Sequence, residues 1–274
     1  MADFDAILDN SPYNALHGCI DRYPKSGFQP ELAEFCRQKP SIALSPLLFY
    51  CVHNDLIAPF EELLNAGIAL DDDVVEAAAG KDNENFLLRV LEHSWPIDKT
   101  LRGGKVPSLL CLVLDRSERL ELLLRRGASP NALSTSAETP LSVAVQTGTL
   151  ESIQSLLKAG ADVRLGDPLH YAIERRADAL EVVRLLLDHK APVNTIQFAH
   201  SSARQLRHSL VRGTPLHKAC LLSKYEVAEL LLRHGADPNI TRIRDSQAEW
   251  TTPLDIAKER GDERMVTLLE THIC

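Results

Sequence analysis

The sequence predicts an all-α fold, built as a solenoid of about seven to eight helix–turn–helix units. One pattern recurs along the chain: in three places a glycine lies 20 residues after a proline, and two of those prolines, Pro107 and Pro140, are 33 residues apart. A fixed period of this size is the signature of repeat architectures. Aromatic residues make up only 5% of the chain, and small and aliphatic residues suit packed short helices better than a β-sandwich.

Two segments show the repeating unit most clearly. Residues 214–239 read T-P-L-H-K-A at 214–219, V-A-E-L-L-L at 227–232 and H-G-A-D-P-N at 234–239. Residues 139–163 open on T-P-L-S-V-A and close on A-G-A-D-V. This unit resembles the ankyrin repeat family, with its T-P-L-H-x-A opening. The resemblance implies stacked helix pairs joined by short hairpin fingers, with first helices and fingertips lining a concave groove.

Six further segments follow the same plan with departures from it. The unit at 167–194 closes two residues late, and we place the surplus in 175–179. We expect residues 1–44 to be a degenerate N-terminal capping repeat and residues 45–274 to be the array, because a terminal repeat exposes one face to water. The six segments are 14–35, 45–67, 74–91, 107–131, 167–194 and 252–269.

Local chemistry explains each part of the unit. A proline at the first helical turn gives up an N–H that has no helical partner, and a threonine before it can cap the helix. The closing glycine can adopt the left-handed conformation that ends the second helix. Asp71, Asp72 and Asp73 precede a helix predicted to begin near Val74, where acidic groups are favoured. We prefer that interpretation to a metal site.

The histidines of the T-P-L-H slot are the first candidates for chemistry. The resemblance implies that His170 and His217, and with them His17, hydrogen-bond to backbone and to neighbouring repeats rather than act in catalysis. The sequence contains no phosphate-loop, H-E-x-x-H, G-x-S-x-G or paired Cys/His zinc motif. We therefore expect no cofactor and no metal, and we interpret the glycine-rich segment 102–105 as a turn.

Composition limits the partners and the compartment. The net charge is −8, which argues against nucleic acid, and no run of about 18 apolar residues is present to span a membrane. The first ten residues lack the basic region of a secretory signal. The six cysteines are scattered, as in a reducing compartment. We expect the cytoplasm, with the nucleus as the alternative.

Two insertions, 194–213 and 240–251, depart from the family pattern. Between residues 194 and 213 there are three arginines and no acidic residue. Long insertions are often functional, although a solvated loop is the simpler interpretation. Arginine and tryptophan are common in interfaces, and arginine can hold a carboxylate with two hydrogen bonds. The insertions thus predict contacts to a partner with an acidic patch, through Arg204, Arg207, His208, Arg242, Arg244 and Trp250.

The resemblance also implies groove positions at fixed offsets from each proline. These are Lys105, Val113, Leu114, Glu138, Gln146, Thr147, Gly166, Glu174, Arg175, Gly213, Leu221, Leu222, Thr251, Glu259 and Arg260. We therefore expect a scaffold that binds a protein or peptide through the concave groove and the fingers, and we favour this over an enzyme. The alternative is an unusual enzyme or small-molecule binder. The two insertions would then close over a pocket, with Glu174, Glu259, Asp245 or His208 supplying acid–base groups.

Overall fold

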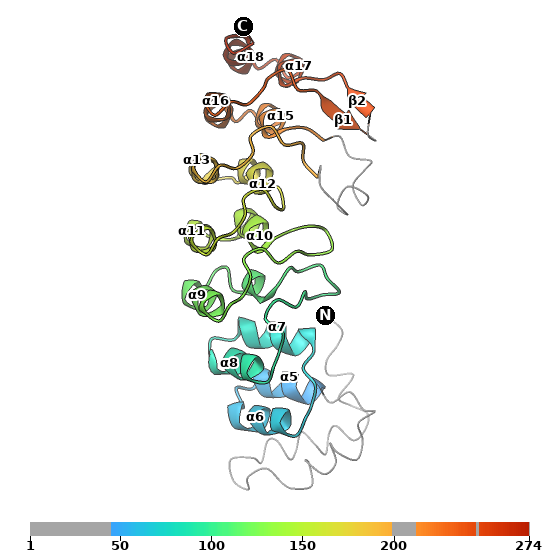
Figure 1. Cartoon of the computed structure of the whole chain (residues 1–274), viewed down its shortest axis with the longest axis vertical. Helices are drawn as coiled ribbons and strands as arrows, with labels where there is room; N and C mark the ends of the chain where they lie inside the picture. Colours follow the sequence, from blue (N-terminus) through green and yellow to red (C-terminus); the bar gives the residue numbers. More distant parts are fainter. Residues whose placement is uncertain (1–44, 199–211, 245–246, 274) are drawn as a thin grey trace. The chain divides into compact units, whose positions relative to one another are not determined.

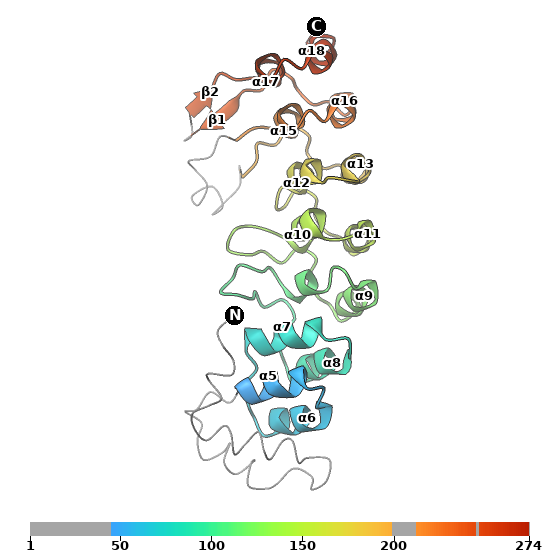
Figure 2. The same cartoon turned by 180° about the vertical axis from the view of Figure 1, so that it is seen from behind.

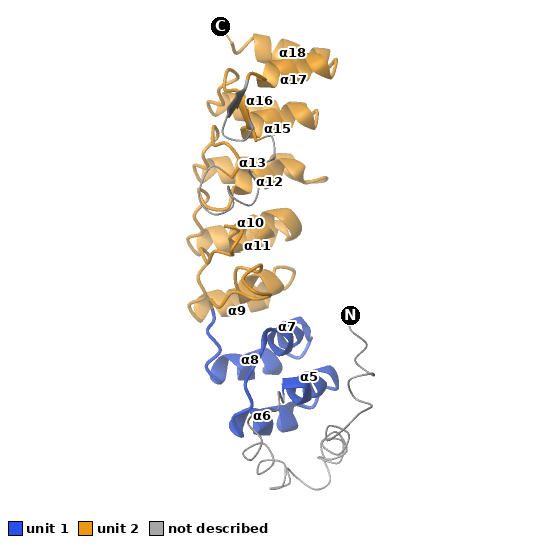
Figure 3. Ribbon diagram, turned by 90° about the vertical axis from the view of Figure 1, so that its right-hand side faces the viewer, with its two compact units in different colours: residues 1–97 blue, residues 98–274 orange. Residues whose placement is uncertain are grey.

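The structure is a computed structural model that describes residues 45–198, 212–244 and 247–273. The chain divides into two compact units, residues 1–97 and 98–274 (Figure 3). The all-α prediction is confirmed, because the described part of each unit is a stack of short helix pairs. The capping repeat predicted at 1–44 lies outside the described residues. No described helix is both long enough and apolar enough to cross a lipid bilayer.

The first unit contains two described helix pairs. α5 (Ser45–His53) packs on α7 (Asp72–Gly80), and α6 (Ile57–Asn65) packs on α8 (Asn85–Glu92). Its core holds Phe60 and Phe86 edge to face, with ring centroids 5.2 Å apart. The acidic segment at 71–73 starts α7 as predicted, since the Asp71 carboxylate accepts a hydrogen bond of 2.9 Å from the Val74 N–H.

The second unit contains five described helix pairs and one strand pair. First helices stack in one column and second helices in another, and the fingers extend from the first-helix side (Figures 1 and 2). Neighbouring repeats share a leucine- and valine-rich core. The elements are η1 (Leu109–Leu112), α9 (Ser117–Arg125), α10 (Pro140–Thr147), α11 (Leu150–Lys158), α12 (Pro168–Glu174), α13 (Ala179–Asp188), α15 (Pro215–Leu221), α16 (Tyr225–Arg233), β1 (Arg242–Arg244), β2 (Gln247–Glu249), α17 (Pro253–Glu259) and α18 (Glu263–Glu270).

The predicted threonine caps are present. Thr139 and Ser142 cap each other: the Thr139 hydroxyl accepts from the Ser142 N–H at 3.1 Å, and the Ser142 hydroxyl accepts from the Thr139 N–H at 2.8 Å. Thr252 forms the same reciprocal pair with Asp255. These caps satisfy N–H groups that have no partner within the helix.

One first helix departs from the pattern. η1 is a short 3₁₀-helix, and its threonine slot holds Val106, which has no hydroxyl to cap an α-helix. Val106 instead pairs with Leu101 in an isolated β-bridge that closes the turn over 102–105. The turn predicted for that glycine-rich segment is therefore confirmed.

The closing glycines adopt the conformation that the sequence predicts. Gly127, Gly160 and Gly235 have φ of 91°, 89° and 86°. In the late-closing unit, one surplus residue lies in the linker 175–178 and the other in α13, which has 10 residues against 9 in α11. Lys190 then occupies the glycine position, with φ of 65°.

Replacing Lys190 with glycine should therefore stabilise the protein. A side chain in the left-handed region costs about 1 kcal/mol relative to glycine, so we expect K190G to raise the free energy of unfolding by about that amount. Urea denaturation followed by circular dichroism measures it. K158G is the matched control, because Lys158 is helical and glycine there should destabilise. A lower unfolding midpoint for K190G would contradict the prediction.

Asparagine side chains connect the fingers to the next repeat. The Asn131 amide donates to the Gly160 carbonyl at 3.0 Å, and its oxygen accepts from the Asp162 N–H at 2.7 Å. Asn194 makes the same pair of bonds to the carbonyl of Gly235 and the N–H of Asp237. Each asparagine thus fixes the position of one repeat on its neighbour.

Candidate functional site

Exposed side chains gather at the C-terminal ends of the first helices of residues 98–274. Two of them are apolar: Leu221 and Leu222, at the end of α15, are 41% and 45% exposed. Because α15 packs on α17, this helix end lies beside the end of α17, which carries the charged residues Glu259 and Arg260. We call the following set the inner surface: Gln146, Glu174, Leu221, Leu222, Glu259 and Arg260, all exposed.

Charged groups on the inner surface are partly paired. Glu174 forms an ion pair with Lys218, and the side chain of Glu174 is half exposed. Lys218 Nζ also lies 3.3 Å from Oε1 of Gln197, so it links α12, α15 and the start of the first insertion. Glu259 and Arg260, at the end of α17, form no ion pair with another described residue.

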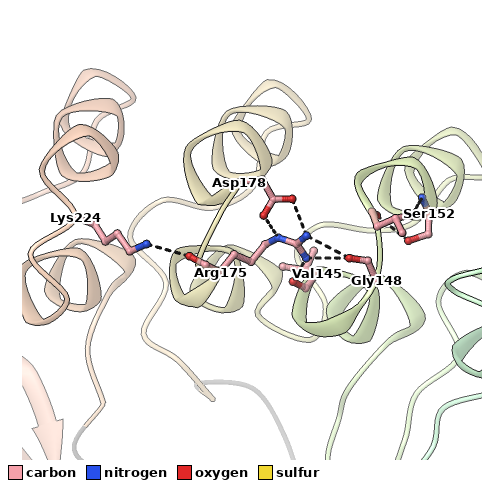
Figure 4. A network of polar contacts seen from close by, with 7 residues as sticks. Val145, Gly148, Ser152, Arg175, Asp178 and Lys224 are labelled. Carbon is pink, nitrogen blue, oxygen red and sulfur yellow. Dashed lines mark hydrogen bonds and ion pairs between the residues drawn. The ribbon is translucent and has the colours of Figure 1, made fainter.

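Arg175 lies in an internal network rather than in an open groove (Figure 4). Its guanidinium binds both carboxylate oxygens of Asp178, at 2.6 and 2.7 Å, and donates to the carbonyls of Val145 and Gly148 at 2.8 and 3.2 Å. Its side chain is only 13% exposed. Because its N–H donors are used within the protein, we remove Arg175 from the predicted contact residues. The Lys224 ammonium binds the Arg175 carbonyl at 3.0 Å and extends the network to the next repeat.

The two slot histidines are structural, as the resemblance implied. His170 Nε2 lies 3.2 Å from the Gly213 carbonyl, and His217 Nε2 lies 3.3 Å from the Thr251 carbonyl, each on the following finger. Nδ1 of His217 accepts from the Thr214 N–H at 3.1 Å. Burial lowers the pKa of His170 to about 3, with a further contribution from Lys218. Burial also lowers the pKa of His217 to about 4.

The second insertion forms a β-hairpin, which the sequence did not predict. β1 pairs with β2 in antiparallel register, and Arg212 forms a bridge to Ile243 on the other side of β1. Trp250 follows β2 and is 86% exposed. The Arg242 backbone N–H donates to the Thr251 carbonyl at 3.1 Å, and the Arg244 backbone lies in β1.

The basic residues of the first insertion divide into two groups. Arg204, Arg207 and His208 lie outside the described residues. Arg212 is buried, and its guanidinium donates to the Phe198 carbonyl at 3.4 Å. Together with the bond from the Gln197 N–H to the Gly213 carbonyl, this contact holds the two ends of the insertion together.

A cavity of about 170 Å³ lies between the fingers around α10 and α12. Leu133, Leu165, Tyr171 and Phe198 supply apolar walls, and Glu138 is among its polar residues. The only residue from either insertion in its lining is Phe198, and no histidine lines it. The predicted pocket closed by both insertions is thus not formed by the described residues, and Glu174 and Glu259 lie outside this cavity.

A second hollow, of about 350 Å³, opens on the first unit beside Trp95. His93 is its only titratable lining residue, and the imidazole lies 3.0 Å from the Arg89 carbonyl and 3.1 Å from Oδ1 of Asn65. Among the described residues, no group of three histidines, cysteines or acidic residues is arranged to hold a metal ion.

Comparison with known proteins agrees with this architecture. The family model "Ankyrin repeats (3 copies)" matches residues 109–197 and 168–242. Mouse inversin is 29% identical over 213 residues, which cover 75% of this chain and 18% of inversin. Human ankyrin repeat and SOCS box protein 16 is 33% identical over 156 residues, covering 56% of this chain and 33% of that protein.

A shorter relative is matched over most of its length. The putative ankyrin repeat protein YahD of Escherichia coli is 25% identical over 182 residues, 56% of this chain and 88% of that protein. The chain spans only a minor part of inversin. The recurring T-P-L opening, the stacked helix pairs with left-handed closures and these matches together show that this chain belongs to the ankyrin repeat family.

Proposed function

We propose that this protein is an interaction scaffold that binds a partner protein or an extended peptide along the inner surface and fingers of residues 98–274. Ankyrin repeat proteins are generally protein–protein interaction modules. The observation that supports the proposal here is a set of exposed apolar side chains on the first-helix side: Leu221, Leu222 and Trp250. The neighbouring second helices bury leucine pairs in the core, Leu186 and Leu187 in α13 and Leu231 and Leu232 in α16.

Exposed apolar side chains are informative when they gather on one side of a molecule. A single exposed leucine is common, but an exposed leucine pair and an almost fully exposed tryptophan in consecutive repeats are typical of an interaction surface. Tryptophan and arginine supply much of the binding free energy in protein interfaces. Trp250 and Arg260 are therefore the contacts that we expect to contribute most.

We further propose that the partner offers acidic groups and that the encounter takes place in the cytoplasm or the nucleus. Arg260 extends from the inner surface, and the two insertions carry several more arginines. An arginine can hold a carboxylate with two parallel hydrogen bonds. The net charge of −8 argues against nucleic acid as the main partner.

The test is a peptide-display selection on the purified protein, followed by affinity measurement of the selected peptides. Changing Trp250 to alanine should weaken binding about tenfold or more, because truncating an aromatic hot spot costs at least ~1–2 kcal/mol. Changing Leu222 to aspartate should have a similar effect. Ile273 is the matched control: it is exposed and apolar but lies beyond α18, so I273A should bind normally. If W250A and L222D bound the selected peptides as tightly as I273A and the unmodified protein do, the inner surface would not be the binding site.

A further inference from the structure

The cavity between the fingers has apolar walls and acidic polar groups. Leu133 and Leu165 come from successive fingers, while Tyr171 and Phe198 contribute largely buried aromatic rings. The lining also includes the carboxylates of Glu138 and Asp167. An apolar cavity that contains acidic residues suits a ligand with a hydrocarbon stem and a positive charge.

The Glu138 carboxylate is held in place by a compact turn. Oε2 of Glu138 accepts from the Ser136 hydroxyl at 3.1 Å, and the Glu138 N–H donates to the Ser134 hydroxyl at 3.0 Å. Ala137, with φ of 62°, completes the turn. Within the described residues, Oε1 of Glu138 has no hydrogen-bond or ion-pair partner, so it can accept from a ligand.

The one arginine in the described lining, Arg164, is already paired. Nε and Nη2 of Arg164 donate to the two carboxylate oxygens of Asp162 at 2.9 and 2.7 Å, so its charge is matched by that aspartate. The side chain of Arg164 is 75% exposed, at the rim. With the charge of Arg164 matched by Asp162, the Glu138 carboxylate contributes a negative charge that no other basic residue of the lining balances.

The opposite wall is fixed by the start of the first insertion. The Phe198 N–H donates to Oδ2 of Asp167 at 2.8 Å, and its carbonyl accepts from the buried Arg212. Phe198 has φ of 59°, a conformation that bulky residues rarely adopt. The polar contacts on both sides of Phe198 therefore hold its ring in the wall before any ligand binds.

We propose that this cavity binds one basic side chain, lysine or arginine, of a partner peptide. The methylene stem packs against Leu133, Leu165 and Tyr171, and the cationic head donates to Oε1 of Glu138. The inference rests on the proposed scaffold function and names the anchor residue of the partner. A cavity of about 170 Å³ is smaller than the roughly 300–1,000 Å³ typical of small-molecule sites, which favours a single side chain over a drug-sized ligand.

Single amino acids with blocked termini test the binding of one side chain in this cavity without other contacts from a partner. We suggest titrating the ¹⁵N-labelled full chain with the N-acetyl N-methylamides of lysine, arginine, norleucine and glutamate, following amide shifts by NMR. Norleucine retains a linear apolar stem and lacks the charge. The lysine and arginine compounds should produce saturable shifts at the amides of Ala137, Leu165 and Gly166. Norleucine should bind about tenfold more weakly, and glutamate should leave these amides unmoved.

Two variants assign the effect to the carboxylate. E138Q keeps the shape of the side chain and removes its charge, so it should weaken lysine binding about tenfold and leave norleucine binding unchanged. E151Q is the matched control, because Glu151 is an exposed glutamate on α11 outside the cavity. It should bind lysine as the unmodified protein does.

Several results would overturn the inference: equal affinity for lysine and norleucine, unchanged lysine binding in E138Q, or shifts that map away from the cavity. The outcome is distinguishable from that of the scaffold proposal. If W250A loses the displayed peptides while E138Q retains lysine binding, only the basic-anchor inference fails. If lysine binds in the cavity while W250A and L222D retain every peptide, only the inner-surface proposal fails.

Discussion

Lowering the pH from 7 to 5 is expected to reduce the free energy of unfolding by about 3–4 kcal/mol, through two buried histidines. His170 and His217 have folded-state pKa values of about 3 and about 4, well below the ordinary value of 6.5. As the pH falls below about 6.5, both histidines of the unfolded chain become protonated, while both histidines of the folded chain stay neutral. This stabilisation is complete above that pH and is lost as the pH falls toward the folded pKa values.

Urea denaturation at pH 7 and pH 5, followed by circular dichroism, measures this loss. H170Q retains a side-chain N–H that can reach the Gly213 carbonyl and cannot titrate, so it should reduce the pH-dependent loss by about half. The exposed His189 and His234 provide controls, and H189Q and H234Q should show the loss of the unmodified protein. Similar stability of the unmodified protein at the two pH values would show that these histidines do not resist protonation.

Changing Arg175 to alanine should cost about 2–4 kcal/mol of stability, because it leaves polar partners unpaired in a largely buried site. The Asp178 carboxylate would lose both charge-assisted hydrogen bonds, and the carbonyls of Val145 and Gly148 would lose their donor. Lysine should recover little of the loss, since an ammonium cannot reproduce the planar fork of a guanidinium.

The neighbouring Arg176 provides the control for this variant. Arg176 is exposed, and surface substitutions of this kind usually change stability by less than about 0.5 kcal/mol. Urea denaturation of R175A, R175K and R176A at pH 7 gives the comparison directly. If R175A unfolded at the same urea concentration as R176A, the guanidinium network would not support the stack of α10 and α12.

The sequence predicted the repeating parts of this fold because each depends on local chemistry. Thr139 and Thr252 cap helices from their own hydroxyls, and Gly160 and Gly235 close helices from their own φ freedom. The caps and the closing glycines can therefore be predicted from the sequence wherever the motif is intact. The late closure at residues 190–194 was also visible from its spacing, although the presence of Lys190 in a left-handed conformation was not.

The parts that escaped prediction depend on contacts between distant segments. The spacing of Arg175 from its proline predicts a groove position. The longer linker, however, brings Asp178 within reach of its guanidinium, and the packing of α12 on α10 supplies the carbonyls that it binds. The hairpin at 242–249 and the bridge from Arg212 to Ile243 have no local motif. The cavity requires residues from four separate segments between Leu133 and Phe198, so no single stretch of sequence reveals it.

The asparagine connections explain how long loops are accommodated by a regular fold. The bond from Asn131 to Gly160 spans 29 residues, whereas the equivalent bond from Asn194 to Gly235 spans 41. The described ends of the loop after Asn194 are also held together, so the connection between these two repeats is kept although it is longer. A foreign recognition peptide grafted between residues 199 and 211 should therefore be displayed without disturbing the solenoid, which makes this position a natural point for engineering new specificity.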